Sequence, residues 1–88
     1  MRYQVLVVYN VEDINNGHLI TSLRLCEGFT ILLRDKIVLL QNVTIQGIIM
    51  PDENSPKEGN SFIVLNEEEV KRIIITDDEN HVLFYWGA

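Results

Sequence analysis

Residues 3–26 read YQVLVVYNVEDINNGHLITSLRLC, and this stretch decides the fold class. It opens with an apolar, β-branched run over residues 3–11, which is typical of a strand. Asn16-Gly17 follows, a dipeptide strongly associated with hairpin turns. Residues 18–26 then alternate between an apolar and a polar face: Leu19, Thr21, Leu23 and Leu25 against His18, Ser22 and Arg24. The pattern predicts a hairpin whose second strand is half-buried.

The composition of the whole chain favours strands. Its 88 residues include 11 Ile and 9 Val but a single Ala, which excludes an all-helical bundle. The length leaves no room for a TIM barrel or a two-half dinucleotide-binding domain. Further strands are expected at residues 29–33, 62–65, 70–76 and 81–86, with a loop over residues 51–60. Residues 37–40 and 43–50 are expected to form either one strand bent at Gln41-Asn42 or two strands. We predict one all-β domain over residues 1–88, an antiparallel barrel or sandwich. A short helix over residues 9–16 stays open as an alternative.

The net charge of −6 is confined to one half of the chain. Residues 1–50 are neutral in sum, whereas residues 51–88 carry nine acidic and three basic side chains. Lys71-Arg72 is the one adjacent basic pair, and Glu67, Glu68 and Glu69 precede it. A general basic surface for nucleic acid is therefore not expected, because such binding depends on Lys and Arg neutralising phosphates. A local pocket, or one built by repeating a subunit, stays open.

The sequence offers no recognisable catalytic or metal-binding motif. His18 abuts a turn, His81 opens the last strand, and no serine-nucleophile elbow or phosphate loop is present. The acidic groups at residues 52–53 and 77–79 lack the spacing of a calcium loop and are expected to be solvated turns. We expect neither an enzyme nor a cofactor or metal.

The single cysteine and the termini indicate the expected compartment. Cys26 has no partner for an internal disulfide, and its apolar surroundings in the sequence predict a buried side chain. No signal peptide pattern is present at the N-terminus, and the longest uncharged stretch, residues 37–51, contains Gln41, Asn42, Thr44 and Gln46. We therefore expect a soluble, cytoplasmic protein.

The order of elements from Gly17 onward resembles the Sm-like family, which includes the Sm, LSm and Hfq proteins. The first Sm motif is approximated by Gly17, Leu23, Leu25, Ile31, Leu33 and Asp35. A variable loop follows at residues 51–60, and Leu65, Val70 and Ile73 keep the aliphatic spacing of the second motif. The layout also looks like that of phage-borne Sm-like proteins. The resemblance covers residues 17–76 and implies a small, strongly bent barrel, to which the strands at residues 3–11 and 81–86 would be additions.

The resemblance implies RNA binding only weakly. The positions of the family's uridine pocket fall on Gly28, Thr30 and Asn66-Glu67 instead of an aromatic residue, an Asn and an Arg-Gly pair. Phe29 lies one position after Gly28, which aligns with the aromatic residue of the family's uridine pocket. The candidate RNA-binding residues are Gly28, Phe29, Thr30, Asn66, Lys71 and Arg72. Two functions are kept. The first is a non-enzymatic module that binds RNA through this site, and the second is a protein-binding or structural assembly subunit, for instance in a phage-related assembly.

The resemblance further implies a ring of about five to seven copies of the chain. In such rings the edge strands of neighbouring subunits pair, and here the expected edges are residues 62–65 and 70–76. The tail over residues 81–86 carries large apolar groups on both faces, which predicts a further contact with a neighbouring subunit. The candidate interface residues are Phe62, Val64, Val70, Ile73, Ile75, Tyr85 and Trp86.

Overall fold

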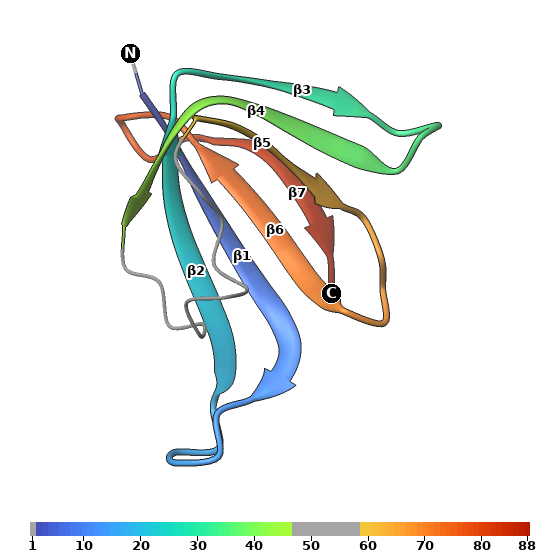
Figure 1. Ribbon diagram of the computed structural model, residues 1–88. Helices are drawn as coiled ribbons and strands as arrows, with labels where there is room; N and C mark the ends of the chain where they lie inside the picture. Colours follow the sequence, from blue (N-terminus) through green and yellow to red (C-terminus); the bar gives the residue numbers. More distant parts are fainter. Residues whose placement is uncertain (1, 47–58) are drawn as a thin grey trace.

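The computed structural model describes residues 2–46 and 59–88, and these residues form seven antiparallel strands (Figure 1). The strands are β1 (Tyr3–Glu12), β2 (Leu19–Cys26), β3 (Gly28–Leu32), β4 (Ile37–Gln46), β5 (Gly59–Val64), β6 (Val70–Thr76) and β7 (Val82–Gly87). The all-β prediction is confirmed. The segment for which a helix was considered, residues 9–16, holds the end of β1 up to Glu12 and then the turn that follows it. The expected continuation of β4 to Met50 and most of the predicted loop lie outside the described residues.

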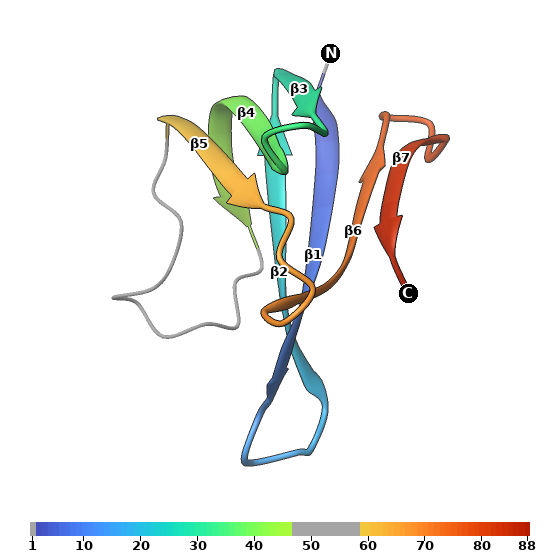
Figure 2. The same cartoon turned by 90° about the vertical axis from the view of Figure 1, so that its right-hand side faces the viewer.

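The strands form one sheet that curls into a half-barrel. Their order is β3-β4-β2-β1-β6-β7, and β5 pairs with the other edge of β4. The first half of β4 pairs with β3 and β5, and its last residues pair with β2. The predicted bend lies between these halves, where Asn42 has a positive φ of 52° and the register shifts. Figure 2 shows β4 and β5 on one side, β6 and β7 on the other, and β1 and β2 between them.

The core fills the inside of the half-barrel. Val5 and Val7 of β1 and Ile73 and Ile75 of β6 are each fully buried, because alternate residues of adjacent strands point to the same face. Side chains from β4, from β5, from the segment after β5 and from the start of β6 complete this core: Val38, Leu40, Val43, Ile63, Leu65 and Val70. The central strands β1 and β6 therefore anchor the fold.

The strand β2 turns its polar face inward. Ser22, Arg24 and Cys26 are buried, whereas Leu23 and Leu25 are half-buried on the outside. A half-buried strand with this alternation ordinarily packs its leucines inside, so the arrangement is the reverse of the usual one. The register explains it, because Ser22 and Arg24 lie opposite the buried valines of β1. The outer leucines are shielded by cross-strand neighbours, and Leu23, Leu6 and Ile74 form one row across β2, β1 and β6.

The predicted hairpin between β1 and β2 is present, with a longer turn than the shortest type. Asp13 and His18 close it through a backbone hydrogen bond of 2.8 Å, and Gly17 adopts a positive φ of 72°. The Asn16 side chain accepts a hydrogen bond from the His18 amide at 2.8 Å. Asn16-Gly17 thus supplies the conformation that a hairpin turn needs.

Candidate functional site

An apolar surface covers the outside of β3, β4 and β5. Its exposed members and their exposed fractions are Phe62 at 61%, Val64 at 48%, Leu39 at 38% and Leu32 at 36%. These side chains are neighbours, because Leu39 pairs with Phe62 and Ile37 pairs with both Leu32 and Val64. We call Leu32, Ile37, Leu39, Phe62 and Val64 the outer β3–β4–β5 face. Exposed apolar patches of this kind are typical of interaction sites.

The outer β3–β4–β5 face follows from strand alternation in a chain with a thin core. Val38, Leu40 and Ile63 point inward and are buried, so their neighbours along β4 and β5 point outward. Phe62 and Val64 were among the candidates from the sequence, whereas Leu32, Ile37 and Leu39 were not. The signal for them is the continuous apolar run of residues 37–40, because one small sheet cannot bury both faces of such a run.

The remaining expected interface residues divide between the core and β7. Val70, Ile73 and Ile75 are 4%, 0% and 0% exposed. Their strand β6 is paired on both sides, by β1 and by β7, so it offers no edge to a neighbouring subunit in this fold. This placement differs from the expectation of an edge at residues 70–76. Among the described residues, the strands paired on one side only are β3, β5 and β7.

Tyr85 and Trp86 lie on opposite faces of β7. Tyr85 is 50% exposed, and its hydroxyl donates a hydrogen bond to the carbonyl oxygen of Ala88 at 3.0 Å. Trp86 lies opposite Ile73 and packs against the core. Two shallow hollows, about 580 and 600 Å³ in volume, meet at Trp86 and Glu67. Trp86 is therefore partly a core residue and partly the floor of a surface groove.

The candidate RNA-binding residues do not form one surface. Gly28, Phe29 and Thr30 lie on β3, and three strands separate β3 from the strand that carries Lys71 and Arg72. The rings of Phe29 and Tyr3 pack nearly perpendicular to each other, with centroids 5.2 Å apart, and Phe29 is partly buried against the core. Asn66 lies in the turn before β6, where its side chain accepts a hydrogen bond from the Glu68 amide at 2.9 Å.

The core contains a buried cation, the guanidinium of Arg24, and no carboxylate of the described residues forms an ion pair with it. Arg24 is 3% exposed, and its guanidinium donates a hydrogen bond to the Tyr9 hydroxyl at 2.9 Å. Burial lowers the pKa of Arg24 from its ordinary value, and the Tyr9 side chain opposes that shift. The Nε atom of Arg24 and the hydroxyl of Ser22 are buried, and neither has a hydrogen-bond partner within residues 2–46 and 59–88. This cluster therefore places a charge and unpaired polar atoms inside the core, where removing them from water costs free energy.

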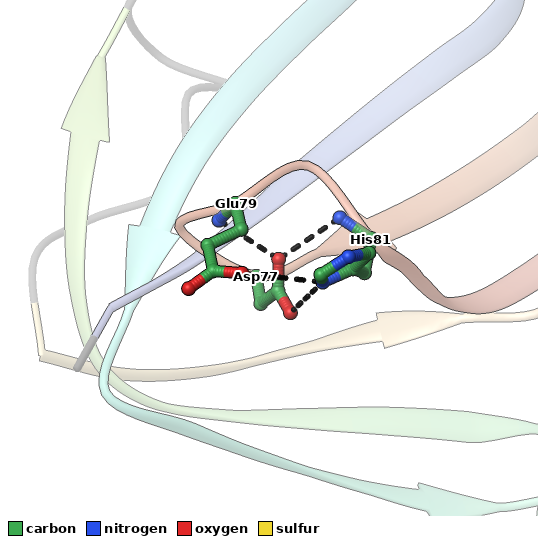
Figure 3. A network of polar contacts seen from close by, with 3 residues as sticks. All are labelled: Asp77, Glu79 and His81. Atoms are coloured by element: carbon green, nitrogen blue, oxygen red, sulfur yellow. Dashed lines mark hydrogen bonds and ion pairs between the residues drawn. The ribbon is translucent and has the colours of Figure 1, made fainter.

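The turn between β6 and β7 holds the one network of charged side chains among residues 2–46 and 59–88 (Figure 3). One carboxylate oxygen of Asp77 accepts hydrogen bonds from the amides of Glu79 and His81, each at 2.9 Å. Its other oxygen lies 3.0 Å from Nδ1 of His81. These contacts hold a tight turn in which Asn80 has a positive φ of 66°. The network fixes the shape of the turn. The acidic side chains of this turn lie where β6 ends and β7 begins.

We predict that this turn loosens at acidic pH. The His81 amide, then the His81 side chain and the Glu79 amide, stabilise the Asp77 carboxylate and lower its pKa from the ordinary 3.8, although desolvation acts in the opposite direction. A lowered pKa in the folded state stabilises it above the ordinary value, and this contribution disappears as the pH falls through the lowered pKa. Amide chemical shifts of Glu79 and His81, followed by NMR from about pH 5 to pH 2, should change with a midpoint below 3.8.

Two amide variants provide the control for this titration. Asp77→Asn removes the titrating group and should flatten the change, because an amide oxygen still accepts the turn hydrogen bonds. Asp78→Asn alters an exposed neighbour and should leave the midpoint unchanged. A midpoint at or above 3.8 in the unmodified protein would contradict the assignment.

The described residues contain no constellation for metal or nucleophilic chemistry. No group of three or more His, Cys, Asp and Glu side chains converges there. The prediction of a buried Cys26 is confirmed, since it is 1% exposed, and burial raises the pKa of its thiol. A thiol in this state is a poor nucleophile.

Two further observations concern membranes and relatives. Within the described part of the chain, no helix has the length and apolarity needed to cross a membrane. No protein-family model, curated protein or solved structure matches this chain, so the Sm-like resemblance stays a prediction carried by its residues alone.

Proposed function

We propose that this chain is a non-enzymatic assembly module that binds protein through the outer β3–β4–β5 face. The observation that carries the proposal is that four neighbouring apolar side chains are exposed to solvent. Their exposed fractions lie between 36% and 61%, and they belong to Leu32, Leu39, Phe62 and Val64. In water an apolar surface is stabilised when a partner covers it, at about 25 cal/mol per Å². The strands β3, β4 and β5 contain no charged residue, which suits binding to protein better than binding to nucleic acid.

The size of the face suggests how a partner would bind. Three strands spaced about 4.8 Å apart and five residues long cover roughly 240 Å². A stable complex ordinarily buries about 800 Å² on each partner. The face alone is too small, so the partner would also use the edge of β5, which pairs with β4 alone among the described residues. The strand β5 contains no charged residue and no proline, the usual protections of an edge.

Photo-crosslinking can test this proposal in cells that produce the chain. A photoreactive amino acid at Phe62 should give adducts of discrete mass, because the side chain would lie inside the contact. The same amino acid at Ile14, which is 98% exposed in the β1–β2 turn, should give none. Val64→Lys should abolish the Phe62 adduct, since it places a charge in the apolar contact. Adducts of equal yield at both positions, or none at Phe62, would contradict the proposal.

RNA binding has less support than protein binding, and we predict that the protein has only a low affinity for RNA. Phe29 is engaged with Tyr3, and the candidate residues lie on separate elements. Any affinity would then come from phosphate contacts and should fall steeply with salt. Fluorescence anisotropy with oligouridine near physiological salt should give a Kd no tighter than about 1 µM. Nanomolar binding that persists at raised salt would instead place a specific RNA site on the protein.

The Sm-like ring also stays a prediction. Its support is β5, which pairs with β4 alone in the part of the chain that the structure describes, because pairing of edge strands is how such a ring would close. The protein-binding proposal does not depend on it, since the outer β3–β4–β5 face would serve a monomer or a ring subunit equally.

A further inference from the structure

The strand β7 presents an unprotected edge. Among the described residues it pairs with β6 alone, so the outward-facing backbone groups of its alternate residues have no strand partner there. It contains no charged residue and no proline. Val82, Leu83 and Tyr85 are 61%, 47% and 50% exposed. Natural edge strands usually carry charges or prolines against pairing, and their absence here favours pairing with another strand.

The two ends of β7 differ in charge. Its first residue follows the turn that contains Asp77, Asp78 and Glu79. Its last residue, Gly87, lies opposite Arg72, and the amide of Ala88 donates a hydrogen bond to the carbonyl oxygen of Lys71. The far end therefore holds the one adjacent basic pair of the sequence, with Glu67 lining the same hollow as Lys71. The strand thus runs from a strongly acidic end to an end where basic side chains offset the acidic ones.

We propose that a second copy of this chain pairs with β7, antiparallel, across a two-fold axis near Phe84 and Tyr85. Antiparallel pairing keeps the two acidic turns apart by the length of β7, roughly 20 Å for six residues. That separation exceeds the screening length of about 8 Å at physiological salt. Each acidic turn would then lie at the Lys71-Arg72 end of the other copy. A parallel pairing would place the two acidic turns side by side.

The side chains of β7 also suit a second copy. A two-fold axis perpendicular to the sheet keeps equivalent faces on the same side, so the inner residues of both copies meet one another. Phe84 lies opposite the buried Ile75, and the partner would extend this inner layer. On the outer face Tyr85 lies opposite Ile74 and would extend the row of Leu6 and Ile74. The midpoint of β7 (Val82–Gly87) lies between Phe84 and Tyr85, which places the axis there when the two copies of the whole strand pair.

Sedimentation of matched lysine variants tests the proposal. We expect the unmodified protein to dimerise reversibly between about 10 and 200 µM, a range suited to a short strand contact. Tyr85→Lys should weaken the dimer at least about tenfold, because it places two like charges at the contact. Ile14→Lys makes a similar exchange of an exposed apolar residue for a charge, far from β7, and should leave the dimer unchanged. Circular dichroism of each variant checks that the fold persists.

Two further measurements keep the proposal testable if Tyr85→Lys does not fold. Lys71→Glu should weaken the dimer, and Asp78→Lys in the same chain should restore part of the affinity, because the two sites face each other across the axis. Isotope-filtered NMR of the unmodified protein should show contacts between copies at Phe84 and Tyr85.

Three results would overturn the inference: a monomer throughout the concentration range, a dimer that Tyr85→Lys leaves unchanged, or a larger ring whose contacts between copies lie on β5. A monomer, or a dimer that Tyr85→Lys leaves unchanged, would not affect the Phe62 adducts. A ring closed on β5 would instead give Phe62 adducts with a second copy of the chain, because Phe62 lies on β5, and the mass of such adducts identifies them. Failure of the inference is therefore distinguishable from failure of the proposed function.

Discussion

Replacing Ile73 with alanine is expected to lower the free energy of unfolding by about 2–5 kcal/mol. Ile73 is fully buried on β6, where it lies opposite Val7 of β1 and Trp86 of β7. Alanine would lose the apolar burial of three heavy atoms and leave a cavity between two paired strands that can close only in part. A domain of this size has a total stability of roughly 4–13 kcal/mol, so the variant would lose a large share of it. Thermal unfolding should show a fall in Tm of at least about 8 °C.

The neighbouring isoleucine provides the matched control. Ile74 has the same side chain on the same strand but points to the outer face and is only half-buried. Ile74→Ala should therefore cost about 1 kcal/mol or less. Ile73→Val, which should cost about 0.5–1.5 kcal/mol, keeps the comparison measurable if Ile73→Ala does not fold. Equal losses for Ile73→Ala and Ile74→Ala would mean that β6 does not present the faces described above.

The sequence predicts the strands of this fold well because their signals are local. The β-branched runs, Asn16-Gly17 and the bend at Gln41-Asn42 each act within a few residues, and the structure contains a strand, a hairpin and a bend at those places. The inward face of β2 was not predictable in the same way. Its alternating leucines could face either side of a sheet. Which side they face depends on the pairing of β2 with β1, where Val5 and Val7 point inward and so direct the residues opposite them inward as well.

Pairing between distant segments also limits prediction of the candidate surface. The sequence points to Phe62 and Val64 as interface candidates through the Sm-like resemblance, which implies an edge strand at residues 62–65. It does not show that β7 would cover one side of β6, and so it assigned Ile73 and Ile75 to an edge. Strand order depends on contacts between residues far apart in sequence, such as β1 with β6, and no local pattern encodes those contacts.

The buried cation in the core gives a second large effect, in which two substitutions have opposite consequences. Tyr9→Phe removes the hydroxyl that accepts the hydrogen bond from Arg24 and leaves the rest of the ring in place. The guanidinium would then stay buried without that partner, and we expect a loss of about 1–3 kcal/mol in the free energy of unfolding. Arg24→Met instead removes the charge and keeps a long apolar side chain in nearly the same volume. Because Arg24 has no carboxylate partner among the described residues, this variant should be as stable as the unmodified protein or more stable.

A double-mutant cycle of Tyr9 and Arg24 separates this explanation from a simple packing effect. If the hydroxyl of Tyr9 matters because it solvates the guanidinium, then Tyr9→Phe should cost less than about 1 kcal/mol once Arg24 is Met. Urea unfolding of the four proteins, compared at similar m-values, gives the coupling between the two residues directly. A large loss of stability from Arg24→Met would contradict the account, because it would show that the buried charge contributes more than its desolvation costs. Such a result would mean that Arg24 has a stronger partner in solution than the Tyr9 hydroxyl.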